Sequence, residues 1–330
     1  MRPTTLLLAA LAATLLLTAC GSERAGTHDG GVGARGPTSR AAVTEPAVDG
    51  VRITSVTIPS SASPSASPSA ADGVTRDGVV EAEPLPTGPS ADSGVSAAYE
   101  VTNSGTEALT YTVLFGFTTS GGEAVSNQKV TVRSVGPGET VRGSVRLGSL
   151  PPGAPQVTRA KVAEVTKVPA GEAPAEADTC PPSGIRVTAD EGDSAMGLRV
   201  VGLLLENCGE RDYTVNGYPE VSLLDEDRQP VDGVRILRGG GGIATVTGFD
   251  DPPRTVTLKP GERASADLMW RNTTGFGTAV DVPYVRVRAR PGAAPVMITP
   301  HLDLGTTGKL GVSAWRTAGE QPGARGAGSP

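Results

Sequence analysis

The stretch Leu204-Leu205-Glu206-Asn207-Cys208-Gly209 decides the fold, because the chain contains it in two versions. The earlier version is Tyr99-Glu100-Val101-Thr102-Asn103-Ser104-Gly105. Each version is a strand-like run that ends in Asn-x-Gly, and Asn and Gly tolerate the positive φ that a tight turn requires. The sequence therefore predicts two related units in which a strand is followed by a tight turn.

Two further motifs follow in the same order in both units. Tyr111-Thr112-Val113 corresponds to Tyr213-Thr214-Val215, and Pro137-Gly138-Glu139 corresponds to Pro260-Gly261-Glu262. Pro-Gly favours a type II turn, because Pro fixes the first φ and Gly accepts the positive φ that follows. Each unit is thus expected to run strand, turn, strand, turn, strand.

The residues between the turns alternate between apolar and polar. Examples are Val130-Thr131-Val132, residues 141–147 and Val285-Arg286-Val287-Arg288. A period of two places one face of a strand in a core and the other in water, as in an antiparallel sheet. We predict an all-β chain with two tandem immunoglobulin-like β-sandwiches, at residues 74–169 and 178–317.

The N-terminus carries a predicted export signal. A leucine-rich run, residues 6–17, follows Arg2 and is too short to span a bilayer. It leads into Leu17-Thr18-Ala19-Cys20, which resembles the cleavage site of bacterial lipoproteins. The resemblance implies that residues 1–19 are a signal peptide and that Cys20 carries a diacylglyceryl group. That lipid would hold the protein at the outer, extracytoplasmic face of the cell membrane.

Segments of low apolar content flank the two predicted sandwiches. Residues 20–73 and 318–330 are rich in Ser, Pro, Ala and Gly, so we expect a disordered tether and a disordered tail. Within the tether, residues 51–58 have β character. Sequence alone leaves open whether they form an edge strand or a segment that pairs with a partner.

Cys180 and Cys208 remain once Cys20 is acylated. An even number of cysteines in an oxidising compartment predicts a disulfide. Closing that loop would stabilise the second unit by roughly 3–4 kcal/mol in the chain-entropy model.

The region from Cys180 to Trp315 contains a set of short motifs: Leu205-Glu206-Asn207, Asn216-Gly217-Tyr218-Pro219, Val221-Ser222-Leu223-Leu224-Asp225, Leu258-Lys259-Pro260-Gly261-Glu262 and Gly308-Lys309-Leu310-Gly311-Val312. With these motifs the region resembles the domain of unknown function DUF4232, a family that is common in lipoproteins of high-GC Gram-positive bacteria. The resemblance implies an exported immunoglobulin-like sandwich and no particular activity.

The net charge and the absence of known catalytic motifs exclude several classes of function. The chain has 29 Lys and Arg against 35 Asp and Glu, a net charge of −6, which argues against nucleic-acid binding. No Gly-x-Ser-x-Gly elbow is present, and Ser126-Asn127-Gln128-Lys129 lacks the partner motifs of penicillin-recognising enzymes. We therefore expect no enzyme and no cofactor.

Acidic clusters are the only weak metal candidates. Asp190 and Asp193 lie in one cluster, and Asp225 and Asp227 in another. Calcium needs six or more converging oxygens, and neither cluster is a complete calcium loop, so we interpret them as solvated turns. Tyr218 and Phe249 lie in a predicted turn and an inserted loop and are the expected contact residues.

We predict a non-catalytic, lipid-anchored envelope protein that binds an unidentified protein or envelope component. Two alternatives remain open at this point. One is a secreted hydrolase with an unrecognised carboxylate pair. The other is a structural or accessory subunit of an exported complex.

Overall fold

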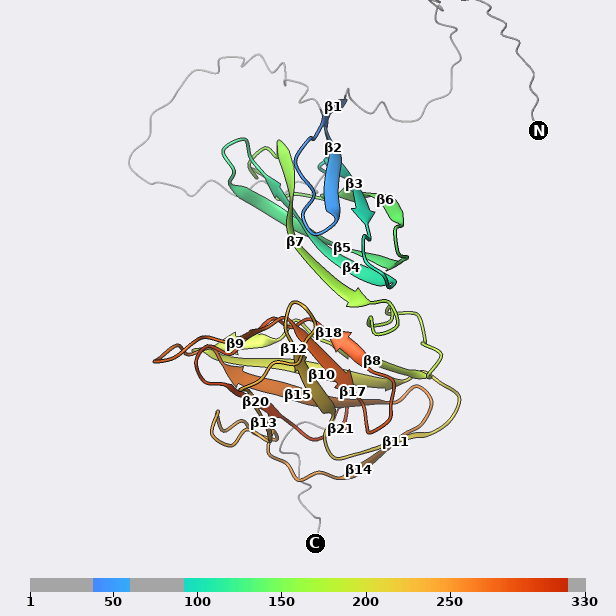
Figure 1. Ribbon diagram of the computed structural model, residues 1–330, viewed down its shortest axis with the longest axis vertical. Coiled ribbons are helices and arrows are strands. Elements are labelled where there is room, and N and C mark those ends of the chain that lie inside the picture. Colours follow the sequence, from blue (N-terminus) through green and yellow to red (C-terminus); the bar gives the residue numbers. More distant parts are fainter. Residues whose placement is uncertain (1–37, 60–91, 320–330) are drawn as a thin grey trace, which may run out of the picture. The chain divides into compact units, whose positions relative to one another are not determined.

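A computed structural model describes residues 38–59 and 92–319 of the chain (Figure 1). Within these ranges all regular elements are β-strands, which confirms the all-β fold class. The same ranges contain no helix, and so none that is long and apolar enough to cross a membrane. The strands form two regions, which are described one at a time.

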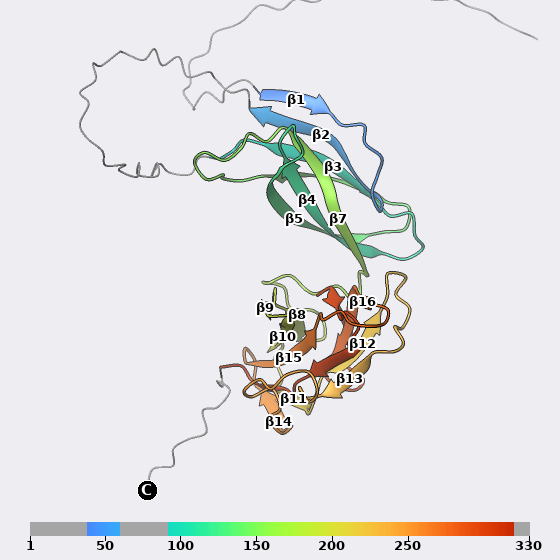
Figure 2. The ribbon, with the colours of Figure 1, turned by 90° about the vertical axis from the view of Figure 1, so that its left-hand side faces the viewer.

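The first region is a sandwich of two antiparallel sheets. One sheet has the order β1 (Thr38–Ala42), β2 (Val51–Pro59), β3 (Ser96–Thr102) and β6 (Thr140–Arg146). The other has the order β5 (Ala124–Val135), β4 (Leu109–Thr118) and β7 (Arg159–Pro169). Figure 2 shows β1, β2 and β3 in one layer and β4, β5 and β7 in the other.

The alternation in β3 and β4 explains why these sheets pack face to face. Successive side chains of a strand point to opposite faces, so every second residue reaches the core. Ala97, Tyr99 and Val101 of β3 are buried, and so are Phe115 and Phe117 of β4. The rings of Tyr99 and Phe115 meet with their centres 5.0 Å apart.

One boundary drawn from the sequence was wrong. Residues 38–59, which we had assigned to the tether, form β1 and β2 of the first sandwich. Strand β2 pairs with β3 in register Val51↔Val101, and Val51 and Ile53 are buried in the core. The strand therefore lies inside a sheet, between β1 and β3, because its alternating apolar residues complete that face of the core. Residues 60–73 lie outside the described ranges.

The second region is also a sandwich. Its larger sheet has the order β13 (Arg235–Arg238), β20 (Lys309–Val312), β15 (Arg263–Arg271), β10 (Leu198–Asn207) and β8 (Ile185–Ala189), with β9 (Asp193–Ala195) paired to β10 and β21 (Arg316–Thr317) to β15. The β13–β20 pair is parallel. The remaining strands pair as β12 (Glu220–Leu224), β17 (Tyr284–Arg288) and β18 (Val296–Ile298), as β11 (Tyr213–Asn216) with β14 (Thr255–Leu258), and as β16 (Asp281–Val282) with β19 (Leu302–Asp303).

Two tryptophans fill the core of the second sandwich. Trp270 and Trp315 are 2% and 1% exposed, which confirms the core position expected for Trp270. A buried indole N–H needs an acceptor. The indole of Trp270 donates to the carboxylate of Asp303 at 2.8 Å, and that of Trp315 to the carbonyl of Ala289 at 2.9 Å.

The segment between β7 and β8 is held against the second sandwich. The carboxylate of Glu172 pairs with the guanidinium of Arg286 on β17 at 2.7 Å. Its carbonyl accepts the amide N–H of Met297 on β18 at 2.7 Å. These contacts fix one wall of a cavity described below.

Candidate functional site

The repeated Asn-x-Gly and Pro-Gly-Glu motifs meet at one buried side chain in each sandwich. Asn207 is 1% exposed, and its amide N–H groups donate to the carbonyls of Arg211 and Leu258, both at 2.8 Å. Its side-chain oxygen accepts the N–H of Gly209 at 3.2 Å. Asn207 thereby ties its own turn to the end of β14.

Asn103 makes the same three bonds in the first sandwich. It is fully buried, donates to the carbonyls of Glu107 and Val135, and accepts from the N–H of Gly105. The two regions are therefore structural versions of one another, as the motifs predicted. We call this arrangement the asparagine latch.

The Glu of each Pro-Gly-Glu motif caps its own turn. The carboxylate of Glu139 accepts the N–H of Gly136 at 2.7 Å, and that of Glu262 accepts the N–H of Lys259 at 2.8 Å. The strongest sequence repeats thus have structural roles in turns, and a functional site must be formed by other residues.

Cys180 and Cys208 form the predicted disulfide. Their Cα atoms lie 5.7 Å apart, within the range that a disulfide permits. The bond joins the segment before β8 to the turn after β10. Because disulfides form and persist in oxidising compartments, the bond indicates an extracytoplasmic location.

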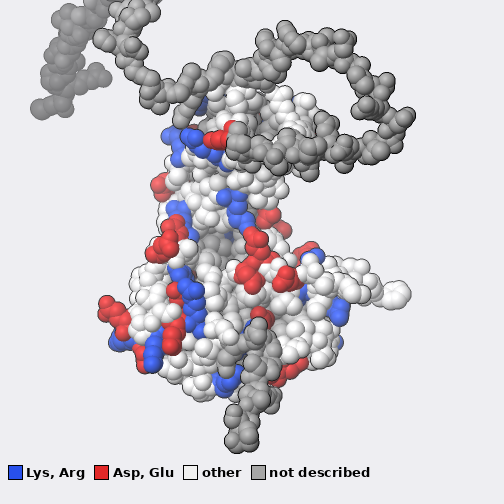
Figure 3. Space-filling view, turned by 180° about the vertical axis from the view of Figure 1, so that it is seen from behind, with Lys and Arg blue, Asp and Glu red and all other residues white. Residues whose placement is uncertain are grey.

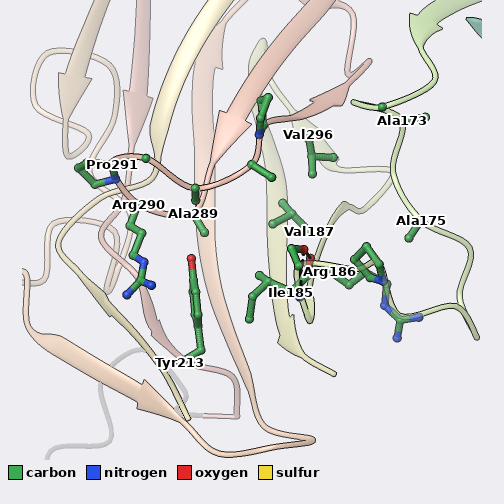
Figure 4. Close-up of a pocket in the computed structure, with 17 residues that line it drawn as sticks. Ala173, Ala175, Ile185, Arg186, Val187, Tyr213, Ala289, Arg290, Pro291 and Val296 are labelled. Atoms are coloured by element: carbon green, nitrogen blue, oxygen red, sulfur yellow. Dashed lines mark hydrogen bonds between the residues drawn. The ribbon is translucent and has the colours of Figure 1, made fainter. Parts of the chain in front are cut away.

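A cavity of about 320 Å³ opens beside the disulfide-bonded end of the second sandwich (Figure 4). Apolar side chains line it, from β8 (Ile185 and Val187) and from β18 (Val296). Ala173 and Ala175 of the segment between β7 and β8 line another side. The cavity thus lies at the edge strands of two sheets, with an irregular segment as one wall.

Tyr213 and Arg290 supply the polar part of this cavity. The guanidinium carbon of Arg290 lies 4.2 Å from the centre of the Tyr213 ring, and Figure 4 shows the two side chains next to one another. Arg290 also donates to the carbonyl of Thr214 at 2.7 Å. Burial raises the pKa of the Tyr213 hydroxyl, and the neighbouring Arg290 cation only partly offsets that effect.

Arg186 lines the same cavity but is already neutralised. Its guanidinium forms an ion pair with Glu206, whose other carboxylate oxygen lies 3.3 Å from Arg263. Hydrogen bonds from the two arginines, Arg186 first, hold the pKa of Glu206 below its usual value. The charge of Arg186 is therefore neutralised by Glu206, whereas no ion pair of Arg290 is seen among the described residues.

Comparison with known families agrees with this architecture. The model of the domain of unknown function DUF4232 matches residues 180–316, from the first cysteine of the disulfide to the first residue of β21. The second sandwich is a DUF4232 domain. No match to the chain was found among curated proteins or among solved structures.

Two of the four residues named as weak calcium candidates, Asp190 and Asp225, serve turns of the DUF4232 domain. The carboxylate of Asp190 accepts the N–H groups of Gly192 and Gly202, both at 2.9 Å. That of Asp225 accepts the N–H of Gln229 at 2.8 Å, in the same loop as the exposed Asp227. Within residues 38–59 and 92–319, no three side chains of the metal-binding types are grouped to hold an ion.

Asp193 lies in exposed strand β9 and lines a separate cavity of about 380 Å³ with Asp303. Asp303 has a structural role there. Burial raises its pKa, but hydrogen bonds from Trp270, Asn272 and Arg199 outweigh that effect and hold the pKa below its usual value. The carboxylate is thus engaged by protein donors.

Phe249, which we expected to be an exposed contact, is buried and 3% exposed. The ring packs against the glycine-rich loop at 239–242. A Cβ atom added at Gly240 would lie 2.5 Å from the Met269 side chain and 2.7 Å from the Ala244 carbonyl oxygen, so this close packing of the loop requires glycine at 240. The loop is further fixed by Asp250, which accepts the N–H of Gly240 at 2.6 Å.

Tyr218, the other expected contact residue, lies in a shallow groove of about 600 Å³. The guanidinium of Arg238 lies 5.5 Å from its ring centre, and the half-exposed Ile236 lines the same groove. Tyr218 is half-buried in this groove, and its role as a contact residue stays a prediction.

Charged side chains are intermixed on the face of the molecule shown in Figure 3. Blue Lys and Arg groups lie among red Asp and Glu groups, and neither sign covers the face alone.

Cys20, the predicted lipidation site, lies outside the described residues. Sequence reasoning also missed Arg290, and it noticed Tyr213 only as part of a repeated motif. A search for a cation near each of the two Tyr-Thr-Val motifs could have found Arg290.

Proposed function

We propose that this protein is a non-catalytic binding module, held outside the cell membrane by a lipid on Cys20, whose ligand enters the cavity at Tyr213. The lipoprotein-like site at residues 17–20 supports the anchor. The disulfide between Cys180 and Cys208 supports an extracytoplasmic location.

The cavity carries the binding part of the proposal. Small-molecule sites are typically concave, about 300–1,000 Å³ in volume, and apolar with a few well-placed polar groups. The cavity has about 320 Å³, a wall of Ile185, Val187 and Val296, and the polar pair Tyr213 and Arg290. It meets each of these criteria at the small end of the size range.

Methyl NMR of the protein tests this site. A library of small fragments is titrated while the methyl signals of Ile185, Val187 and Val296 are followed. We expect binders to perturb these three signals, and Ala175→Trp to abolish the perturbation by filling the entrance. Ala124→Trp, at an exposed position of β5, is the matched control. A library that perturbs only methyls elsewhere would refute the assignment of the site.

The anchor is tested separately in cells. Two acyl chains, at about 0.8 kcal/mol per buried methylene, retain a protein stably on a bilayer. We expect the wild type to partition into the detergent phase and Cys20→Ala to be released or to stay unprocessed. Equal partitioning of both forms would exclude the lipid anchor and leave the binding site untouched.

A further inference from the structure

The two sandwiches repeat one corner of the fold. Tyr111 and Tyr213 each open a Tyr-Thr-Val motif that follows the latch asparagine. Each tyrosine has a cation beside it. Lys167 of β7 is the register partner of Tyr111, and Arg290 lies over the ring of Tyr213.

The partner of that cation differs between the two sandwiches. In the first, the ammonium of Lys167 lies 2.7 Å from the carboxylate of Asp49. Asp49 precedes Val51 by two residues, and Val51 pairs with Val101 on β3, the strand that ends one residue before Asn103. The charge of this corner is therefore satisfied within the protein.

The equivalent position in the second sandwich cannot supply a carboxylate. Val187 pairs with Leu205 on the strand that ends at Asn207, so counting back two residues gives Ile185 as the counterpart of Asp49. Among the described residues, no carboxylate lies within 4.0 Å of Arg290, whose contacts are the Thr214 carbonyl and the Tyr213 ring. The cation is kept, and the described residues supply no carboxylate to pair with it.

The corner at Arg290 coincides with space for a ligand. Arg290, Tyr213 and Ile185 line both the cavity of about 320 Å³ and an adjoining cavity of about 620 Å³. The acidic residues Glu210 and Asp212 line only the adjoining cavity. A ligand anion is therefore favoured at the Tyr213–Arg290 junction, with its apolar part on the side of Val187 and away from these acids.

The chemistry of the two polar side chains specifies the group they bind. A guanidinium has only donors and matches the geometry of a carboxylate. The Tyr213 hydroxyl keeps its own proton when its oxygen accepts a hydrogen bond from an arginine. Its O–H can therefore still donate to a ligand carboxylate.

We propose that this cavity binds a monocarboxylate with a compact apolar body, whose carboxylate takes the place that Asp49 occupies in the first sandwich. The inference rests on the proposed function, and it adds the ligand class. The free acid of a small molecule and the C-terminus of a peptide share this chemistry.

Isothermal titration of the mature protein in lipid nanodiscs tests the proposal, since nanodiscs keep free detergent out of the cavity. Hexanoate represents a free acid and N-acetylleucine a peptide C-terminus, and hexanamide and N-acetylleucinamide are their neutral controls. We expect at least one acid to bind about tenfold or more tightly than its amide, as a charge-assisted hydrogen bond provides.

Two substitutions locate the effect. Arg290→Gln should remove the preference for the acid and leave amide binding unchanged. Ile185→Asp should supply the internal carboxylate of the first sandwich and block acid binding, whereas the uncharged Ile185→Asn should not. Arg238→Gln, which removes a cation over a different tyrosine, Tyr218, is the control for loss of an arginine.

The outcomes separate the two levels of the argument. If an acid and its amide bind with equal affinity and both perturb the methyl signals of the cavity, the carboxylate inference is wrong and the proposed site still stands. An acid preference that survives Arg290→Gln would also overturn that inference. Absence of binding by all four probes at about 10 mM would refute the ligand class, and only the methyl NMR screen decides on the site itself.

Discussion

Removal of the asparagine latch should destabilise one sandwich at a time. In Asn207→Ala, the carbonyl of Leu258 loses a hydrogen bond that is fully buried. The carbonyl of Arg211 and the N–H of Gly209 lose bonds that are partly buried, and water can replace these. The substitution therefore leaves one unsatisfied acceptor in the core and weakens two turn contacts.

The magnitude follows from these three bonds. A buried polar group left unpaired costs about 1–3 kcal/mol, and each partly buried bond contributes about 0.5–1.5 kcal/mol. We expect Asn207→Ala to lower the free energy of unfolding of the DUF4232 domain by about 3 kcal/mol. With an m-value near 1.5–2 kcal/mol/M, the urea midpoint should fall by about 1.5–2 M.

Tryptophan fluorescence makes the measurement specific to one sandwich. The chain has two tryptophans, Trp270 and Trp315, and both lie in the core of the DUF4232 domain. Urea unfolding followed by their emission should shift in Asn207→Ala. Asn103→Ala should destabilise the first sandwich, which hydrogen exchange of β3 would report, and leave the tryptophan transition in place.

The controls lie in the same turns. Ser104→Ala and Glu210→Ala change exposed side chains beside the latch and should shift neither transition by more than about 0.5 kcal/mol. A shift below about 1 kcal/mol in Asn207→Ala would refute the reasoning, because it would mean that the buried carbonyl of Leu258 is satisfied without the asparagine.

Three further outcomes are expected. Reduction of Cys180–Cys208, which closes a loop with a sequence separation of 28, should cost about 3.6 kcal/mol and lower the melting temperature of the second sandwich by roughly 12 °C, whereas free thiols in exported protein would exclude the bond. Because the pKa of Asp303 is held low, its stabilisation is present above the unfolded value near 3.9 and is lost as the pH falls through the folded value. Asp303→Asn should therefore unfold more easily at pH 7 and lose less stability between about pH 5 and 3, and an unchanged acid slope would contradict this. Phe249→Ala should cost about 3–5 kcal/mol in urea unfolding, and a neutral result would place its ring outside the core.

Local sequence patterns determined the buried faces of the strands, the tight turns and the disulfide of this protein. Alternation along single strands, such as Ala97, Tyr99 and Val101, specifies which face is buried, because the side-chain period of a strand is a property of the backbone alone. The Asn-x-Gly and Pro-Gly-Glu turns were recognisable for the same reason, since a positive φ is a demand on one or two residues. Cys180 and Cys208 could be paired because no other partner remained.

Tertiary structure decided whatever depends on residues that are distant in sequence. Strand β2 belongs to a sheet only because β3, a strand distant in sequence, presents the matching face, and no local signal separates such a strand from a β-like tether segment. Phe249 is buried and packs near Gly240, whereas the loop's sequence suggested only flexibility. Among the described residues no carboxylate pairs with Arg290. Ile185 is the counterpart of Asp49 when residues are counted along the strand registers, and that count requires the strand pairing of both sandwiches.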